Sequence, residues 1–154
     1  MRKKNYLDKF KLSNKIAVVI GGYGLMGYEI SRALSDSGAK VIILDLEKNK
    51  LQRIKNSHFV KFDCKNYGKF KLVLMNISKK FGPPQIYVNA SYPATNDWPK
   101  NTFEEINHNS FKNNIDLHLN SFTFMAKIFA DFLKRSKKKR INYTNFIDIW
   151  FSCT

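Results

Sequence analysis

The sequence predicts an α/β domain in which helices cover both faces of a doubly wound parallel sheet. Three observations support this: short apolar segments alternate with amphipathic ones, glycines follow the first apolar segment, and an aspartate ends the second. Strands separated by helices are typical of parallel sheets. With 154 residues, of which 44% are hydrophobic, the chain is long enough for one domain with a sizeable core.

The first half of the chain predicts a strand, a helix and two further strands. Residues 15–20 form a β-branched apolar run that ends on glycines, as a buried strand would. Beyond them, apolar residues recur at helical spacing as far as Gly38, where a helix would end. Residues 40–46 (KVIILDL) predict a second buried strand, and residues 59–62 predict a weaker third.

The second half continues the alternation. Apolar residues at helical spacing between Tyr67 and Phe81 predict a helix, and residues 85–90 (QIYVNA) predict a fourth strand. Thr102 and Glu105 have the spacing of a capping box at the start of a long helix. One face of that helix carries Phe111, Ile115, His118, Phe122, Met125, Phe129 and Phe132.

The segment GGYGLMG carries the strongest functional signal. Gly21, Gly24 and Gly27 follow a strand and open a helix, so the backbone can turn tightly and approach a pyrophosphate. Asp45 ends the next strand, 18 residues after Gly27, where a carboxylate can bond a ribose diol. The pattern predicts a Rossmann-like dinucleotide site, and the alternative is a structural glycine turn beside a strand-end aspartate.

The same residues favour NAD(H) over NADP(H). The Asp45 carboxylate would repel a 2′-phosphate. No Arg or Lys lies within the glycine turn to hold that phosphate. We therefore expect NAD as the cofactor.

From residue 15 to residue 139 the sequence resembles the short-chain dehydrogenase/reductase family. The resemblance rests on VIGGYGLMG, on Asp45 as the ribose acid, on Asp63 and Cys64 at the adenine-contacting strand end, and on VNASYP at 88–93. With DWPKNTFEEI and NNIDLHLNSF, the chain looks most like the subgroup linked to flagellin modification and nonulosonic-acid-type sugar biosynthesis. The cofactor-binding residues that this implies are Gly21, Gly24, Leu25, Met26, Gly27, Asp45, Asp63, Cys64, Asn89, Ala90 and Ser91.

The sequence departs from the family pattern at four positions. Ile20 replaces the usual Thr before the glycines, Ala90 stands where a second Asn is common, and Ser91 stands where Ala is expected. His118 occupies the slot of the family's active-site Asn in the long helix. Its imidazole could hold a water by a hydrogen bond or could pack on an otherwise apolar face, and both roles remain open.

The resemblance also implies catalytic residues that we do not find. In the family a Tyr, activated by a Lys four residues later, transfers the proton, and a Ser after the fifth strand orients the carbonyl. Tyr67 and Lys71 have that spacing, but they lie between the third and fourth strands, so we interpret them as a coincidence. We predict a domain truncated after the fourth or fifth strand, with no catalytic residue: the NAD(H)-binding portion of an oxidoreductase, inactive as written. The alternative is an NAD-sensing or interaction module without catalysis.

The last residues suggest a frameshift. Synonymous codons can be chosen for residues 140–154 so that dropping one base gives GSIIQISSIYGFLAP, a likeness of the family's fifth strand and serine segment. We therefore predict a basic leader at 1–14, an NAD-binding portion at 15–139 and an out-of-frame tail at 140–154. The alternating apolar residues of TNFIDIWF leave open that the tail adds a fifth strand.

The charge and the composition limit the classes of partner that we expect. The net charge is +15, from 27 Lys and Arg against 12 Asp and Glu, but twelve of the basic residues lie in 1–15 and 134–140. The body is therefore only mildly basic, and we do not expect nucleic-acid binding. The longest apolar run, Ile16 to Ile20, is too short to cross a membrane.

Two further expectations follow. The polar start argues against a secretory signal, and two distant cysteines match no metal-ligand spacing, so we expect a cytoplasmic chain with no metal site. The resemblance implies that most subunit-packing helices lie beyond this sequence. The long Phe-rich helix should then expose an apolar stripe, and we expect self-association.

Overall fold

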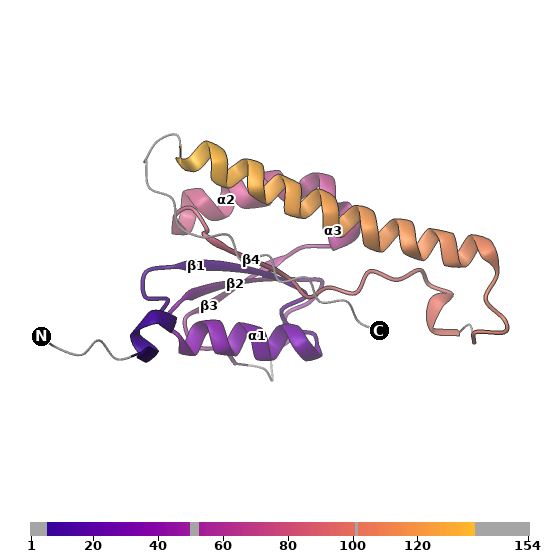
Figure 1. Cartoon of the computed structure of the whole chain (residues 1–154), viewed down its shortest axis with the longest axis horizontal. Helices are drawn as coiled ribbons and strands as arrows, with labels where there is room; N and C mark the ends of the chain where they lie inside the picture. The colour runs from indigo at the N-terminus through magenta and orange to yellow at the C-terminus, as the bar shows by residue number, and fades with distance from the viewer. Residues whose placement is uncertain (1–5, 50–52, 101, 138–154) are drawn as a thin grey trace, which may run out of the picture.

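A computed structural model describes residues 6–49, 53–100 and 102–137, and it confirms the predicted α/β architecture (Figure 1). The strands are β1 (Ile16–Ile20), β2 (Lys40–Asp45), β3 (Ser57–Lys61) and β4 (Ile86–Asn89). The α-helices are α1 (Leu25–Asp36), α2 (Phe70–Phe81) and α3 (His108–Lys137). Short 3-10 helices are η1 (Tyr6–Phe10), η2 (Cys64–Lys69) and η3 (Trp98–Lys100).

The four strands form one parallel sheet in the order β3-β2-β1-β4. After β1 the chain builds outwards through β2 and β3, and it then returns to place β4 on the other side of β1. The strand order therefore reverses between β1 and β4. Ligands of open α/β sheets bind at such a reversal, outside the carboxyl ends of the strands.

The sheet separates two apolar layers, with α1 on one face and α2 and α3 on the other (Figure 1). Alternate residues of β1 point to opposite faces. Val18 and Ile20 belong to the larger cluster, with Phe70 and Leu74 of α2 and Met125 of α3. On the α1 face Val19 packs with two buried residues of β2, and Leu34 of α1 is partly buried against them.

The long helix differs from the prediction at its start. Thr102 and Glu105 do pair, with 3.1 Å between Thr102 Oγ1 and Glu105 Oε2, but they form a turn before the helix. The predicted capping box at the helix start is therefore wrong. The cap is Asn107, whose Oδ1 accepts from the Ser110 amide at 2.9 Å and so satisfies a donor of the first turn.

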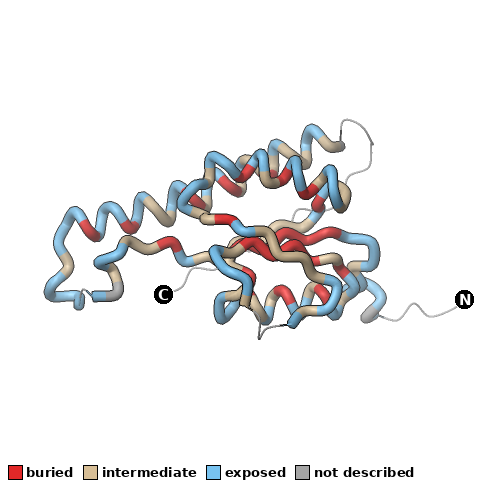
Figure 2. The backbone as a smooth tube through the Cα atoms, turned by 180° about the vertical axis from the view of Figure 1, so that it is seen from behind, coloured by how far each residue is buried: buried red, intermediate tan, exposed pale blue. Residues whose placement is uncertain are grey.

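The first half of α3 projects past the carboxyl ends of the strands (Figure 1). Its buried positions recur along one side only (Figure 2). No helix in the described ranges is both long enough and apolar enough to cross a membrane. Residues 1–5 of the predicted leader and the whole predicted tail, 140–154, lie outside the described residues.

Candidate functional site: the cleft at the strand ends

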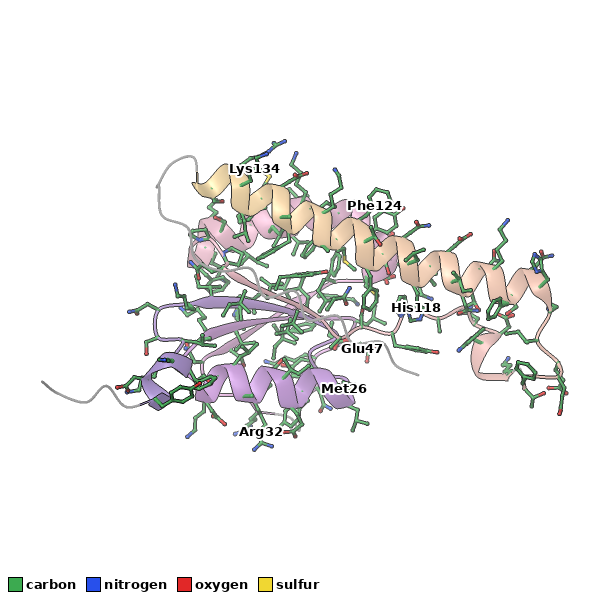
Figure 3. All side chains as sticks on the ribbon, in the orientation of Figure 1. Met26, Arg32, Glu47, His118, Phe124 and Lys134 are labelled. Atoms are coloured by element: carbon green, nitrogen blue, oxygen red, sulfur yellow. The ribbon has the colours of Figure 1, made fainter. Side chains whose placement is uncertain are left out.

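A cleft of about 1320 Å³ opens at the carboxyl ends of β1, β2 and β4. Its walls come from the glycine turn, from the ends of these strands, from η2 and from α3. Of the eleven residues predicted to bind the cofactor, nine line this cleft: Gly21, Gly24, Leu25, Met26, Asp45, Cys64, Asn89, Ala90 and Ser91. Met26, Glu47 and His118 lie at this end of the molecule, whereas Phe124 points away from it (Figure 3). The fold thus brings together predicted site residues from four separate segments of the chain.

The glycines of the turn pack directly against neighbouring backbone atoms, which leaves no room for a side chain. Gly21 has φ +70°, and a Cβ on it would lie 2.7 Å from the Ser91 nitrogen. A Cβ on Gly27 would lie 2.0 Å from the Gly21 carbonyl oxygen, so Gly27 supports the turn from beneath and does not line the cleft. Gly22, which the sequence reasoning passed over, is also required, because its Cβ would lie 2.9 Å from Cγ2 of Ile43.

The start of α1 suits an anion. Gly24 is the N-cap, so no side chain caps the helix, and no acidic residue occupies its first turn. The first amide groups of a helix have no partner within it, and they carry the positive end of the helix dipole. Leu25, the first helical residue, is 91% exposed at the cleft. The amides there remain accessible to a ligand such as a pyrophosphate.

Asp45 is fixed in place by two backbone amides. Its Oδ2 accepts from the Tyr23 amide at 2.9 Å, and its Oδ1 accepts from the Leu46 amide at 2.8 Å. Each carboxylate oxygen keeps a further lone pair for a ligand hydroxyl. Burial raises the pKa of Tyr23, and the Asp45 charge raises it further. No local sequence pattern predicts the bond between Tyr23 and Asp45, because the two residues lie 22 positions apart.

Asp63 follows β3 at the predicted strand end, and its contact with a ligand stays a prediction. Its Oδ1 accepts from the Lys65 amide at 2.9 Å, which caps η2, and Asp63 does not line the cleft. Its neighbour Cys64 does line the cleft. Burial raises the pKa of the Cys64 thiol, so this thiol is a poor nucleophile at neutral pH.

The end of β4 forms a small polar cluster against the glycine turn. Asn89 Oδ1 accepts from the Ser91 amide at 3.1 Å and from Ser91 Oγ at 2.6 Å. Asn89 Nδ2 is buried and has no hydrogen-bond partner in the described part of the chain. Unsatisfied buried donors are uncommon, so this amide is a candidate contact for a ligand carbonyl.

His118 packs against two aromatic rings and also lines the cleft. The ring centroids are 4.7 Å from Tyr92, edge to face, and 6.0 Å from Phe122, stacked. Burial lowers the pKa of His118, which favours the neutral imidazole. The packing role therefore has direct support, and a role in holding water stays a prediction. Tyr67 stacks on Phe124 outside the cleft, which supports reading Tyr67 and Lys71 as a coincidence.

A buried amide that the sequence reasoning missed ties the loop before α3 to the helix. Asn114 Oδ1 accepts from the Thr95 amide at 3.0 Å, and Asn114 Nδ2 donates to Thr95 Oγ1 at 2.6 Å and to the Ser110 carbonyl at 2.9 Å. Lys65 Nζ donates to the Ala94 carbonyl at 2.7 Å. These bonds hold the loop that carries Tyr92 against the cleft. Among the described residues no three His, Cys, Asp or Glu side chains come together as a metal site.

The model of the short chain dehydrogenase family matches residues 15–144, which is most of the chain. The chain belongs to the short-chain dehydrogenase family. This confirms the resemblance drawn from the glycine turn and the fourth-strand segment. The chain is 24% identical over 147 residues to post-translational flagellin modification protein A of Campylobacter coli and 26% identical over 143 residues to L-fucose dehydrogenase of Oryctolagus cuniculus.

Solved short-chain dehydrogenases share the fold. A short-chain dehydrogenase of Leptospira borgpetersenii with bound NAD+ superposes with a TM-score of 0.71 at 21% identity, over 90% of this chain and 53% of that one. The two curated relatives are covered over 56% and 49% of their lengths, against 90% and 89% of this chain. This short-chain dehydrogenase sequence therefore spans about half the length of the curated relatives it matches.

Proposed function

We propose that this chain is the NAD(H)-binding portion of a short-chain oxidoreductase and that it is catalytically inactive as it stands. The observation that carries the proposal is the position of Asp45, which ends β2, bonds the glycine turn and lines the cleft. A carboxylate so placed can accept the hydroxyls of an adenosine ribose. The uncapped start of α1 offers amides and a positive dipole end to the pyrophosphate.

The other cleft residues suit the remaining parts of a dinucleotide. Cys64 lies beside the strand ends on the α2 face, where the resemblance assigns the adenine. The unpaired Asn89 amide offers a buried donor near the glycine turn. A bound nicotinamide would supply the hydride, and these protein groups would bind and orient it.

The cleft lacks an activated proton donor among its described residues. Tyr23 and Tyr92 both line it, but burial and Asp45 raise the pKa of Tyr23, which is opposite to what proton transfer near neutral pH requires. Tyr92 is followed four residues later by Asn96, not by Lys. We therefore expect no measurable reduction of a carbonyl substrate with NADH.

We propose NAD rather than NADP as the ligand. Asp45 and Glu47 line the cleft with one basic residue, Lys48, among its described walls. Two carboxylates oppose a 2′-phosphate more strongly than one ammonium attracts it. Titration calorimetry should show saturable 1:1 binding of NAD and binding of NADP weaker by roughly tenfold or more. Equal affinities would contradict the preference, and no binding of either would contradict the proposed function.

A pair of variants tests whether Asp45 is the carboxylate that binds the ribose. Asp45→Ser should weaken NAD binding by roughly tenfold, because the ribose loses its acceptor. It should also reduce the difference between the dissociation constants for NAD and NADP. Glu47→Gln is the matched control, since Glu47 lines the same cleft without bonding the glycine turn. It should change NAD affinity by less than about twofold. A larger loss from Glu47→Gln than from Asp45→Ser would contradict the assignment.

The alternative function is an NAD-sensing or interaction module that never carried the catalytic residues. The exposed apolar side chains of α3 favour it, since they suit a partner. The two functions differ in the gene. A frameshift near Lys139, with 140–154 out of frame, predicts a Tyr-x-x-x-Lys segment in another frame downstream. A sensing module predicts none.

Three further expectations stay proposals. We propose a cytoplasmic location, self-association, and no physiological nucleic-acid ligand. Retention on DNA with a log-log salt slope of several units would contradict the last of these.

A further inference from the structure

Lysine side chains gather at the amino ends of the strands, which is the end of the molecule opposite the cleft. The strands are parallel, so β1, β2 and β3 all begin at this end, and α2 and α3 both end there (Figure 1). The short helix η1 lies at this end as well. The lysines there that are at least partly exposed form what we call the basic end: Lys9, Lys15, Lys40, Lys55, Lys80 and Lys134.

The fold brings these lysines together from distant segments. Lys15 precedes β1 and Lys40 begins β2, and the Lys40 amide donates to the Lys15 carbonyl at 2.9 Å. The centroid of the Phe81 ring, at the end of α2, lies 5.5 Å from Lys40 Nζ and 5.1 Å from Lys80 Nζ. Lys134, near the end of α3, lies at this end too, away from the cleft (Figure 3). Charges that are far apart in the sequence therefore act on one region of the surface.

Acidic side chains offset little of this charge. Asp8 pairs with Lys11 at 2.6 Å, and Asp131 pairs with Lys127 at 3.5 Å, so both carboxylates bind lysines outside the set. Asp36, at the end of α1, is the other acidic residue of this end in the described part of the chain. The basic end therefore keeps a clear excess of positive charge.

The cleft end carries no such excess, because acidic residues gather there. Asp45 ends β2, and Glu47 and Asp63 lie just beyond the ends of β2 and β3. Glu104 and Glu105 precede the projecting start of α3. A negatively charged surface therefore attracts the basic end and orients the molecule with its cleft pointing away.

Two exposed aromatic rings lie among the lysines. Tyr6 and Phe10 of η1 are 68% and 60% exposed, and their ring centroids are 5.9 Å apart. Lys9 Nζ lies 4.8 Å from the centroid of the Tyr6 ring. Aromatic rings flanked by lysines are typical of proteins that bind at a membrane–water interface, where the rings enter the headgroup layer.

We propose that the basic end, together with Tyr6 and Phe10, binds the surface of a bilayer that contains anionic lipids. The lysines supply the electrostatic attraction, and the two rings add burial at the level of the headgroups. The chain lies on the bilayer and does not cross it. The cleft faces the aqueous phase in this orientation, so binding to the bilayer does not depend on NAD binding.

The same residues favour a bilayer over nucleic acid. Bases stack on open aromatic faces, whereas Lys9 lies over the Tyr6 ring. Arginine is the side chain that forks onto phosphates and base edges, and the basic end as defined contains lysines. Lysines act as separate point charges, which suits a surface whose negative charge is spread over many headgroups.

Co-sedimentation of the full chain with vesicles tests the proposal. We expect binding to phosphatidylcholine vesicles that contain about one third phosphatidylserine, and no binding to vesicles of phosphatidylcholine alone. Raising the salt from about 0.1 M to about 0.5 M should release most of the chain, because salt screens the attraction. The triple variant Lys15→Gln, Lys55→Gln, Lys80→Gln should lower the partition coefficient by about tenfold or more.

A second triple variant removes the same charge at the cleft end. Lys61 ends β3, Lys71 lies in the first turn of α2, and Lys112 lies near the start of α3, and all three are exposed. Replacing these three by Gln should change the partition coefficient by less than about twofold, because salt screens the far end of the molecule from the bilayer. Circular dichroism checks that both variants are folded. Equal losses from the two triple variants would overturn the assignment to the basic end.

A serine replacement tests the rings of η1. Phe10→Ser should lower the partition coefficient several-fold, whereas Phe103→Ser, which removes a ring that is 96% exposed before α3, should change it by less than about twofold. Equal effects of the two replacements would overturn the role of the rings. Absence of binding to the anionic vesicles, or equal binding to both kinds of vesicle, would overturn the proposal. Tighter binding of duplex DNA than of the anionic vesicles at the same salt would also overturn it, since the surface would then belong to nucleic acid.

Discussion

The two sides of β1 are built differently. On one side β1, α1 and β2 form a unit whose strand residues are almost fully buried, and whose glycine turn and strand-end aspartate bond each other directly. On the other side β4 is half-buried, pairs with β1 alone in the described part of the chain, and lies below a helix that projects past the sheet. The glycine turn and the aspartate of the proposed dinucleotide site thus both lie within residues 16–45, whereas the strand on the other side of β1 is only half-buried.

The largest effect should come from disrupting the glycine turn, on the side of β1 that holds α1 and β2. Gly27→Ala places a Cβ about where the Gly21 carbonyl oxygen lies, 2.0 Å away, so the backbone of the turn must move. We expect a loss of about 3 kcal/mol in the free energy of unfolding, measured by urea titration, together with loss of NAD binding. Gly68→Ala is the control, since nothing lies within 4 Å of its Cβ. A Gly27→Ala variant as stable as Gly68→Ala would contradict the contact.

A smaller effect should come from the β4 side of β1, where α3 and the loop before it lie. Asn114→Leu removes the amide that holds Thr95 and Ser110, and it should lower the free energy of unfolding by about 2 kcal/mol. NAD affinity should change by less than about threefold, because Asn114 does not line the cleft. Asn113→Leu replaces an exposed neighbour and should cost far less. If both variants lost stability equally, the loop would not depend on this amide.

The smallest effect is a pH dependence that involves both sides. Burial lowers the pKa of His118 in α3, and burial together with Lys80 lowers the pKa of His58 in β3. As pH falls through about 6.5, the unfolded chain takes up these protons before the folded one does. The free energy of unfolding should therefore decrease between pH 7.5 and pH 5.5.

Variants separate the two histidines. His118→Gln and His58→Gln should each flatten the dependence, and His108→Gln, at the exposed start of α3, is the control. Stability that rose as the pH fell through this window would contradict both pKa directions.

Local patterns account for what the sequence could predict. The first strand was expected at 15–20 and lies at 16–20, and the second was expected at 40–46 and lies at 40–45. Both are continuous apolar runs bounded by polar or glycine residues, so the local sequence is enough to predict where each strand begins and ends. The third strand, expected at 59–62, begins two residues earlier, at Ser57, because pairing with β2 and not apolar content sets its start.

Contacts between distant segments account for what the sequence could not predict. The bond from the Tyr23 amide to Asp45 spans 22 residues, and the bonds between Asn114 and Thr95 span 19. No periodicity marks a polar residue that is buried by another segment of the chain. The role of Asn107 as the cap was missed for a related reason, because Thr102 and Glu105 also match the capping pattern.

Amide chemical shifts during an NAD titration test the central claim most directly. The account predicts saturable shifts of Gly21, Tyr23, Gly24, Leu25 and Asp45, the residues of the glycine turn and the end of β2, in a 1:1 complex. It also predicts that no NADH forms when an alcohol substrate is added. Shifts confined to other surfaces, or no saturable shift at all, would contradict an NAD site at the glycine turn and the end of β2.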